Sequence, residues 1–91
     1  MELKKKLIIG NDLWLHARAA SKIVALSREY ESELFLSKDG HEVDGGSILS
    51  ILTLACPKGT EIGVRVVGDE DSEELMTEIT ALFEQKFGEG K

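Results

Sequence analysis

The sequence predicts an α+β fold in which one antiparallel-rich sheet is covered on one face by helices. Strand-like and helical periodicities alternate in the order strand, helix, strand, strand, helix, strand, helix. One tight hairpin signal, Asp39-Gly40, joins two strand segments directly. The 91 residues suffice for one domain with a modest core. We therefore expect a single two-layer domain over residues 1–88 and a frayed, disordered tail at residues 89–91.

The first third of the chain supplies a strand and a helix. In residues 3–9 one alternating set is Leu3, Lys5, Leu7 and Ile9, and the other is Lys4, Lys6 and Ile8. This predicts a strand with one face more apolar than the other. The turn-forming residues 10–12 interrupt it. Small and apolar side chains then follow helical spacing as far as Tyr30, with no Gly or Pro between. This spacing predicts a helix that begins near His16.

The middle of the chain is predicted to form a hairpin and a short apolar helix. Residues 33–37 and 41–43 read as strands on either side of Asp39-Gly40, where glycine accepts the positive φ of a tight turn. Ser47 then opens the compact apolar stretch 48–55 and is placed to cap it.

The last third supplies a strand and a long helix. Residues 61–67 alternate cleanly, and the next segment begins with acidic residues that suit a helix dipole. Either Asp69 or Asp71 can cap this helix, and Asp71 with Glu74 has capping-box spacing. The helix carries an apolar stripe: Leu75, Ile79, Leu82 and Phe83.

Composition excludes several classes of protein. The net charge of -6 argues against a general nucleic-acid binder. The single cysteine, Cys56, cannot form an internal disulfide, which favours a reducing compartment. No apolar run approaches the roughly 20 residues that span a bilayer, and the apolar run 7–10 is too short for a signal peptide. We expect a cytoplasmic location without membrane insertion.

The sequence gives no sign of a metal or cofactor site. His41 and Cys56 have no neighbours at zinc-ligand spacing, and Cys56 is more typical of a small buried side chain than of a nucleophile. The nine glycines form neither a dinucleotide-binding pattern nor a phosphate loop. We expect neither a metal nor a cofactor.

The junction between loop and helix at residues 11–21 carries the most chemistry. The first N–H groups of a helix, here including those of Ala17 and Arg18, lack intrahelical partners and favour an anion. His16 adds a nucleophilic imidazole, and Arg18 adds forked donors for phosphate oxygens. This pattern suggests a covalent phosphoryl site. On the bare pattern, a surface histidine that merely precedes a helix is the commoner case.

Ser47 and the apolar run that follows it form a second cluster. Ser47 caps the predicted short helix, and a phosphate there would interact with the helix dipole. From the pattern alone, a purely structural cap is the simpler interpretation. The run is also more apolar than one face of a short helix needs, so part of it could be an exposed docking patch or all of it could be core.

Three segments resemble a known family. They are LHARAA around His16, DGGSILSILTLACPKGTEI around Ser47 and GDEDSEELMTEITALFEQKFGE near the end. Together they resemble the histidine-containing phosphocarrier (HPr) family of the bacterial phosphoenolpyruvate-dependent sugar phosphotransferase system. The resemblance covers nearly the whole chain. It implies an open-faced β-sandwich in the order βαββαβα, with four mainly antiparallel strands covered on one face by three helices.

The resemblance also implies roles for individual residues. His16 would accept phosphate on Nδ1 from phosphorylated enzyme I and hand it to a IIA domain, while Arg18 steadies the phosphoryl group. Ser47 would be a regulatory site for an HPr kinase/phosphorylase, with a transcriptional regulator as a further partner. Partners would dock on the apolar side chains Ile48, Leu49 and Leu52. The protein would be a monomeric carrier that partner enzymes phosphorylate, and not itself an enzyme.

Two positions depart from the family pattern. Ala19 stands where the family usually has proline, which restores a backbone N–H near the phosphate. Trp14 stands where the family often has a small residue, which bears on the identity of the partners.

Other functions remain open. One is a regulatory binding module without a sugar-transport role, in carbon-catabolite or nitrogen-related signalling. A related one is a phosphocarrier for a nitrogen-related or dihydroxyacetone-kinase pathway. Another is an unrelated α+β ligand-binding or structural domain in which His16 is incidental.

Overall fold

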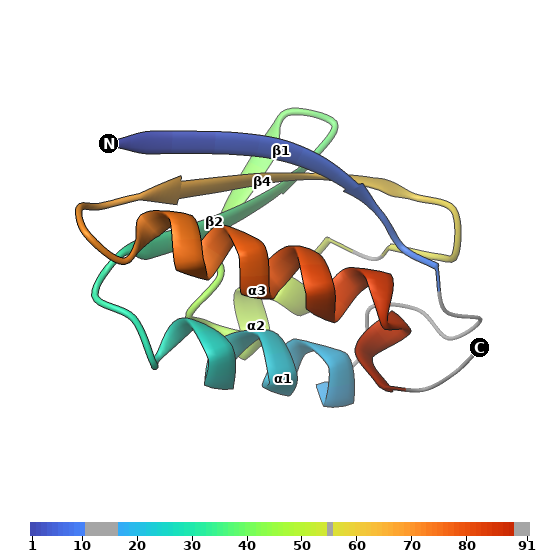
Figure 1. The fold of residues 1–91 in the computed structure, drawn as a ribbon. Coiled ribbons are helices and arrows are strands. Elements are labelled where there is room, and N and C mark those ends of the chain that lie inside the picture. The colour runs from blue at the N-terminus through green and yellow to red at the C-terminus, as the bar shows by residue number, and fades with distance from the viewer. Residues whose placement is uncertain (11–16, 55, 89–91) are drawn as a thin grey trace.

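The computed structural model describes residues 1–10, 17–54 and 56–88, which form a helical layer packed on one face of a sheet (Figure 1). The four strands are antiparallel and pair in the order β1-β4-β2-β3. Their bounds are β1 Glu2–Ile8, β2 Glu33–Lys38, β3 His41–Asp44 and β4 Glu61–Val67. The helices are α1 Ala17–Ser27, α2 Ile48–Leu52 and α3 Ser72–Glu84, followed by the short 3-10 turn η1 Lys86–Gly88. The expected βαββαβα order and fold class are confirmed.

The hairpin between β2 and β3 forms at the predicted turn. Asp39 and Gly40 both have positive φ, 51° and 83°. Two successive left-handed residues match the twist of a tight antiparallel hairpin, and aspartate tolerates this region better than most residues do. The register then pairs Lys38 with His41, so each strand reaches one residue further than the sequence predicted.

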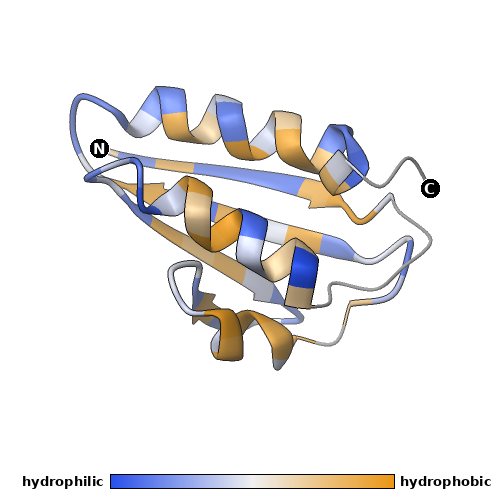
Figure 2. Ribbon diagram, turned by 90° about the horizontal axis from the view of Figure 1, so that it is seen from below, coloured by the Kyte–Doolittle hydropathy of each residue, from blue (hydrophilic) through white to orange (hydrophobic). Residues whose placement is uncertain are grey.

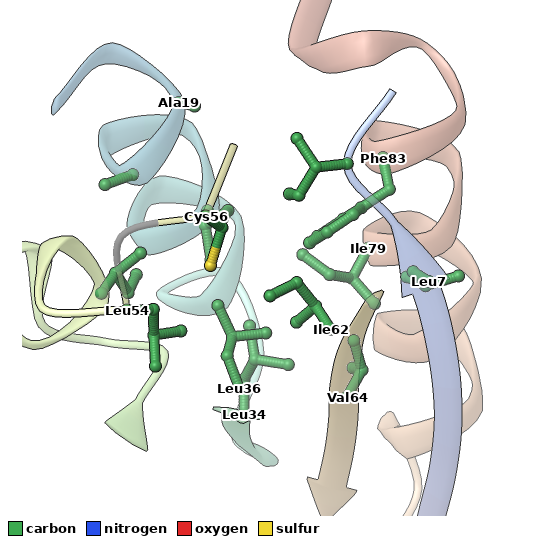
Figure 3. Packing of buried hydrophobic residues seen from close by; sticks show 14 of the residues in the cluster. Leu7, Ala19, Leu34, Leu36, Leu54, Cys56, Ile62, Val64, Ile79 and Phe83 are labelled. Carbon is green, nitrogen blue, oxygen red and sulfur yellow. The ribbon is translucent and has the colours of Figure 1, made fainter. Parts of the chain in front are cut away.

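Strand alternation determines which side chains enter the core. In β4, Ile62, Val64 and Val66 are buried against the helices, as the period of two predicted. Figure 3 shows Leu34, Leu36, Ile62 and Val64 of the sheet approaching side chains that come from the helices. Helices α1 and α3 are striped in hydropathy, whereas α2 is apolar around most of its surface (Figure 2). The layer between sheet and helices is therefore one continuous apolar core.

None of the described helices covers the other face of the sheet (Figure 1). There Arg65 lies 4.4 Å from the ring centroid of Phe35 and pairs with carboxylates on both sides. Its Nη1 lies 2.9 Å from Glu2 Oε2, and its Nη2 lies 2.7 Å from Glu42 Oε1. The hydrogen bonds from Arg65 hold the pKa of Glu42 below its usual value. These side chains tie β1, β4 and β3 together across the open face.

The predicted end of the first helix is wrong by three residues. The helix ends at Ser27 and not at Tyr30. Glu29 N–H donates to the Leu26 carbonyl at 3.0 Å and Tyr30 N–H to the Ser27 carbonyl at 3.3 Å. These three-residue hydrogen bonds tighten the chain into a turn and end the helix. The predicted apolar helix likewise ends at Leu52, and residue 55 lies outside the described residues.

The predicted capping box of the last helix is also wrong. Asp71 occupies the N-cap position of α3, but its side chain makes no capping hydrogen bond. Its carboxylate instead accepts from Glu31 N–H at 2.7 Å, from Ser32 N–H at 3.2 Å and from the Ser32 hydroxyl. Glu74 does not reach back either, because it accepts from the Tyr30 hydroxyl at 2.9 Å. Both carboxylates bind the turn between α1 and β2.

This carboxylate network has electrostatic and steric consequences. The hydrogen bonds from Ser32 and Glu31 hold the pKa of Asp71 below its usual value. Burial and the hydrogen bond to Glu74 raise the pKa of Tyr30 to about 12. Gly68 lies so close to the turn that a Cβ there would come within 2.1 Å of Ser32 Oγ. The turn is thus packed tightly against the start of α3.

Among the helices that the structure describes, none is long and apolar enough to cross a membrane. Residues 89–91, expected to be a frayed tail, lie outside the described part of the chain.

Candidate functional site

The start of α1 has the features expected of an anion site. Ala17 and Arg18 are exposed, whereas Ala19 and Ala20 are fully buried and hold the first turn against the core. The first turn contains no acidic residue, in contrast to α3, which has Glu73 and Glu74 there. Since the first N–H groups of a helix lack intrahelical acceptors, this end carries partial positive charge. Arg18 adds a guanidinium to the same turn.

His16 itself belongs to residues 11–16, which lie outside the described part of the chain, as does Trp14. The roles assigned to these two residues therefore remain predictions. In the sequence His16 directly precedes Ala17, the first residue of α1.

Ala19, which replaces the family's usual proline, is the third residue of α1 and has no exposed surface. Its methyl group packs in the core among residues that include Ile23 and Cys56. An alanine in this position continues the helix without the restriction that proline places on the preceding residue. The additional N–H near the phosphate stays a prediction.

Ser47 is the N-cap of α2, as predicted. Its backbone is extended (φ -124°, ψ 115°), and its Oγ accepts from Ser50 N–H at 3.3 Å. The preceding turn is closed by Asp44, whose carboxylate accepts from Gly46 N–H at 2.7 Å and whose carbonyl accepts from Ser47 N–H at 3.2 Å. A phosphate on Ser47 would gain from the helix start and would meet the negative charge of Asp44.

The apolar run of α2 is divided between core and surface. Ile51 has no exposed surface, and Leu54 is 3% exposed. Leu49 is 78% exposed and Ile48 is 37% exposed, while Leu52 is partly buried against the core. Large exposed apolar side chains are candidates for binding a partner. Of the three predicted docking residues, Leu49 and Ile48 are thus the more available.

Ser47 and Arg18 lie near opposite ends of α1. Gly46, next to Ser47, lies beside the end of α1, because a Cβ on Gly46 would come within 3.7 Å of Ser27 Oγ. Arg18 lies at the other end of that helix, nine residues earlier. At 1.5 Å per residue the separation along the axis is about 13 Å. A phosphate on Ser47 would therefore be added at a distance from the first turn of α1.

Sequence reasoning missed one cation near the start of α1. Lys22 is exposed, and its ammonium donates to the backbone carbonyl of Phe87. Its sequence signal is the four-residue spacing from Arg18, which puts both cations on one face of the helix. Nothing in the sequence pattern pointed to the contact with Phe87.

The weaker candidates do not form a site. Cys56 has no exposed surface, and burial raises the pKa of its thiol, which disfavours the nucleophilic thiolate. His41 is exposed at the start of β3. Within residues 1–10, 17–54 and 56–88, no three His, Cys, Asp or Glu side chains come close enough together to hold a metal ion.

Comparisons with known proteins agree on one family. A family model described as the PTS HPr component phosphorylation site matches residues 3–85. Phosphocarrier protein HPr of Xylella fastidiosa is 41% identical over 87 residues, which cover 96% of this chain and 97% of that protein. Phosphocarrier protein NPr of Escherichia coli is 34% identical over 90 residues, covering 98% and 99%. The crystal structure of HPr-C-His from Thermoanaerobacter tengcongensis superposes with a TM-score of 0.84 at 31% identity, covering 96% and 97%.

Proposed function

The chain belongs to the HPr family of phosphocarriers of the phosphotransferase system, and on that premise we propose that His16 carries a phosphoryl group from phosphorylated enzyme I to a IIA domain. The observation that carries this proposal is the start of α1. It presents exposed Arg18 and no acidic residue in a turn whose N–H groups favour an anion. His16 directly precedes that turn.

In the proposed chemistry His16 receives a phosphoryl group and passes it on, and the protein does not convert a substrate of its own. The Nδ1 lone pair of His16 forms an N–P bond as the bond between phosphorus and the donor breaks, and the donor keeps the bonding electron pair. The N–H groups of Ala17 and Arg18, with the Arg18 guanidinium, stabilise the negative charge on the phosphoryl oxygens. Transfer to the acceptor repeats these steps with His16 as the donor. In this proposal the protein is a carrier that partner enzymes phosphorylate, working in the cytoplasm.

Docking and regulation form the second half of the proposal. Exposed Leu49 and Ile48, with Leu52 beside them, contact enzyme I and the IIA domain. Ser47 is the substrate of an HPr kinase/phosphorylase. A phosphate there would add about -1.5 to -2 charge next to the docking residues and weaken the binding of acidic partners.

The test is direct phosphorylation. The protein is mixed with enzyme I and phosphoenolpyruvate, and the modified residue is located by mass spectrometry under alkaline conditions, which preserve phosphohistidine. We expect one acid-labile phosphate on His16 and none in His16→Ala. If His16→Ala is labelled as well as the wild type, the proposal is wrong.

A second candidate is a carrier or regulatory module with no part in sugar transport. It is favoured by the 34% identity to a relative named NPr over nearly the whole chain. The two candidates differ in their partners and not in the chemistry at His16. A panel of purified phosphotransferase donors and acceptors separates them. The sugar-transport function requires transfer from phosphorylated His16 to a IIA domain of a sugar permease, whereas the alternative predicts none.

A further inference from the structure

The chain takes an unusual path after α3. Lys86, Phe87 and Gly88 all have positive φ, 54°, 56° and 76°. Glycine tolerates this left-handed region, but two successive residues with Cβ atoms rarely adopt it. Such a conformation persists only where surrounding contacts impose it. We call these three residues the C-terminal turn.

Three contacts hold the C-terminal turn in place. The Phe87 side chain is 1% exposed, and its ring centroid lies 5.0 Å from that of Phe83. Gly88 N–H donates to the Gln85 carbonyl at 2.9 Å. The Lys22 ammonium donates to the Phe87 carbonyl, 65 positions away in the sequence. The turn is thus attached both to α3 and to α1.

The C-terminal turn also reaches the residue that precedes the segment 11–16. A Cβ on Gly10 would lie 3.6 Å from Lys86 Cγ and 3.7 Å from Lys86 Cε, so the Lys86 stem covers the Gly10 backbone. Lys22 lies in α1, which follows that segment. Neighbouring residues of one short turn therefore contact Gly10, which precedes residues 11–16, and Lys22 in the second turn of α1, the helix that follows them.

We propose that the C-terminal turn, through Lys86 and Lys22, positions Gly10 and helix α1, which lie before and after the segment that carries His16. Lys22 is then a positioning residue. Its contact with the Phe87 carbonyl anchors the first two turns of α1, which carry Arg18 four residues earlier on the same face. The contact also explains why a second cation is tolerated near the positive end of α1, because the carbonyl compensates its charge. This inference rests on the proposed function of His16.

The experiment compares Lys22→Met, Lys22→Arg and the control Lys4→Met. Methionine keeps the apolar stem and removes the donor, whereas arginine restores a cationic donor. Lys4 lies on the open face of the sheet, where its ammonium is 4.0 Å from Glu2. One measurement is amide hydrogen exchange of residues 18–23. The other is the rate at which His16 gains phosphate from enzyme I and phosphoenolpyruvate.

In Lys22→Met we expect faster exchange in residues 18–23 and a rate of phosphate gain lowered by about three- to tenfold, because misplaced reacting groups slow transfer. Lys22→Arg should restore most of both properties, and Lys4→Met should change neither. Lys86→Ala removes the stem over Gly10 and should also slow phosphate gain.

The outcomes separate this inference from the proposed function. If the wild type is phosphorylated and Lys22→Met gains phosphate at the same rate, the positioning role is overturned. A loss of rate that arginine does not restore also overturns the role of the carbonyl contact. If the wild type gains no phosphate on His16, the proposed function fails. Amide hydrogen exchange then tests only whether the C-terminal turn positions α1. Unchanged protection in Lys22→Met would overturn that positioning role.

Discussion

The two ends of the helical layer use the start of a helix in opposite ways. Helices α1 and α3 run antiparallel, so each end of the layer joins the start of one helix to the end of the other (Figure 1). At the acidic end, comprising residues 28–32 and 68–74, carboxylates accept hydrogen bonds from the chain itself. At the site end, comprising Gly10, residues 17–22 and the C-terminal turn, the helix start has exposed Arg18 and no acidic residue.

The difference shows how one local structure can serve stability or binding. A helix start favours negative charge wherever that charge comes from. The start of α3 receives it from its own Glu73 and Glu74, so this end needs no ligand. The first turn of α1 contains no acidic residue, and in the proposed function the phosphoryl group supplies this charge. Substitutions at the acidic end should therefore change mainly the stability of the protein, and substitutions at the site end should change mainly its function.

The largest expected effect is a loss of stability on adding one methyl group at the acidic end. In Gly68→Ala the new Cβ would lie 2.1 Å from Ser32 Oγ and 2.8 Å from Ser32 Cα. The backbone must shift to relieve this, at a cost of about 3 kcal/mol of unfolding free energy. The matched control is Gly10→Ala at the site end, where the nearest atom lies 3.6 Å away and the change should stay within about 0.5 kcal/mol. Urea unfolding measures the free energy of unfolding of both variants. Equal losses in the two variants would contradict the difference between the two ends.

The next effect concerns pH and the carboxylate network. Because the pKa of Asp71 is lowered in the folded state, its stabilising contribution is present above the usual aspartate pKa of 3.8 and is lost as the pH falls through the lower folded value. Asp71→Asn should therefore melt several degrees lower than the wild type at pH 7, and the difference should narrow below pH 3.8. Thermal unfolding followed by circular dichroism across this range is the measurement. A difference in melting temperature that stays constant with pH would exclude a stabilising role of the ionised Asp71 carboxylate.

A smaller effect, on function alone, is expected at the site end. Arg18→Gln should slow phosphate gain on His16 by about tenfold, equivalent to about 1.4 kcal/mol of transition-state stabilisation, because one charged donor to the phosphoryl oxygens is lost. Its melting temperature should change little, since the side chain is exposed. Arg28→Gln, at the residue that follows the last residue of α1, is the matched control and should match the wild type in rate. Equal slowing in the two variants would show that overall charge, and not position, governs the reaction.

The smallest effect is expected at the docking surface. Leu49→Ser removes a side chain that is 78% exposed, so stability should be nearly unchanged. Binding to enzyme I should weaken by a few-fold, corresponding to about 1 kcal/mol. Ile8→Thr is the control, because Ile8 is 53% exposed in β1, away from α2. Isothermal titration calorimetry measures the binding of enzyme I to both variants. Unchanged binding by Leu49→Ser would show that Leu49 is not part of the docking surface.

Local patterns predicted most of the fold because they report on neighbouring residues. Alternation in residues 61–67 gave the buried side of β4, and Asp39-Gly40 gave the hairpin, since both depend on a few consecutive residues. The capping of α2 by Ser47 followed from the same kind of signal. The capping of α3 did not, because the Asp71 carboxylate is taken by N–H groups of the turn at residues 31–32.

The amino-acid sequence by itself determined the order of the elements, the buried side of β4 and the cationic, acid-free start of α1, because these follow from residue types at short spacing. Only the tertiary structure decided that Leu49 is exposed while Ile51 is buried, and that Lys22 binds the Phe87 carbonyl. These outcomes depend on how α2 is turned against the sheet and on residues far apart in the chain. Periodicity within one segment carries no information about either.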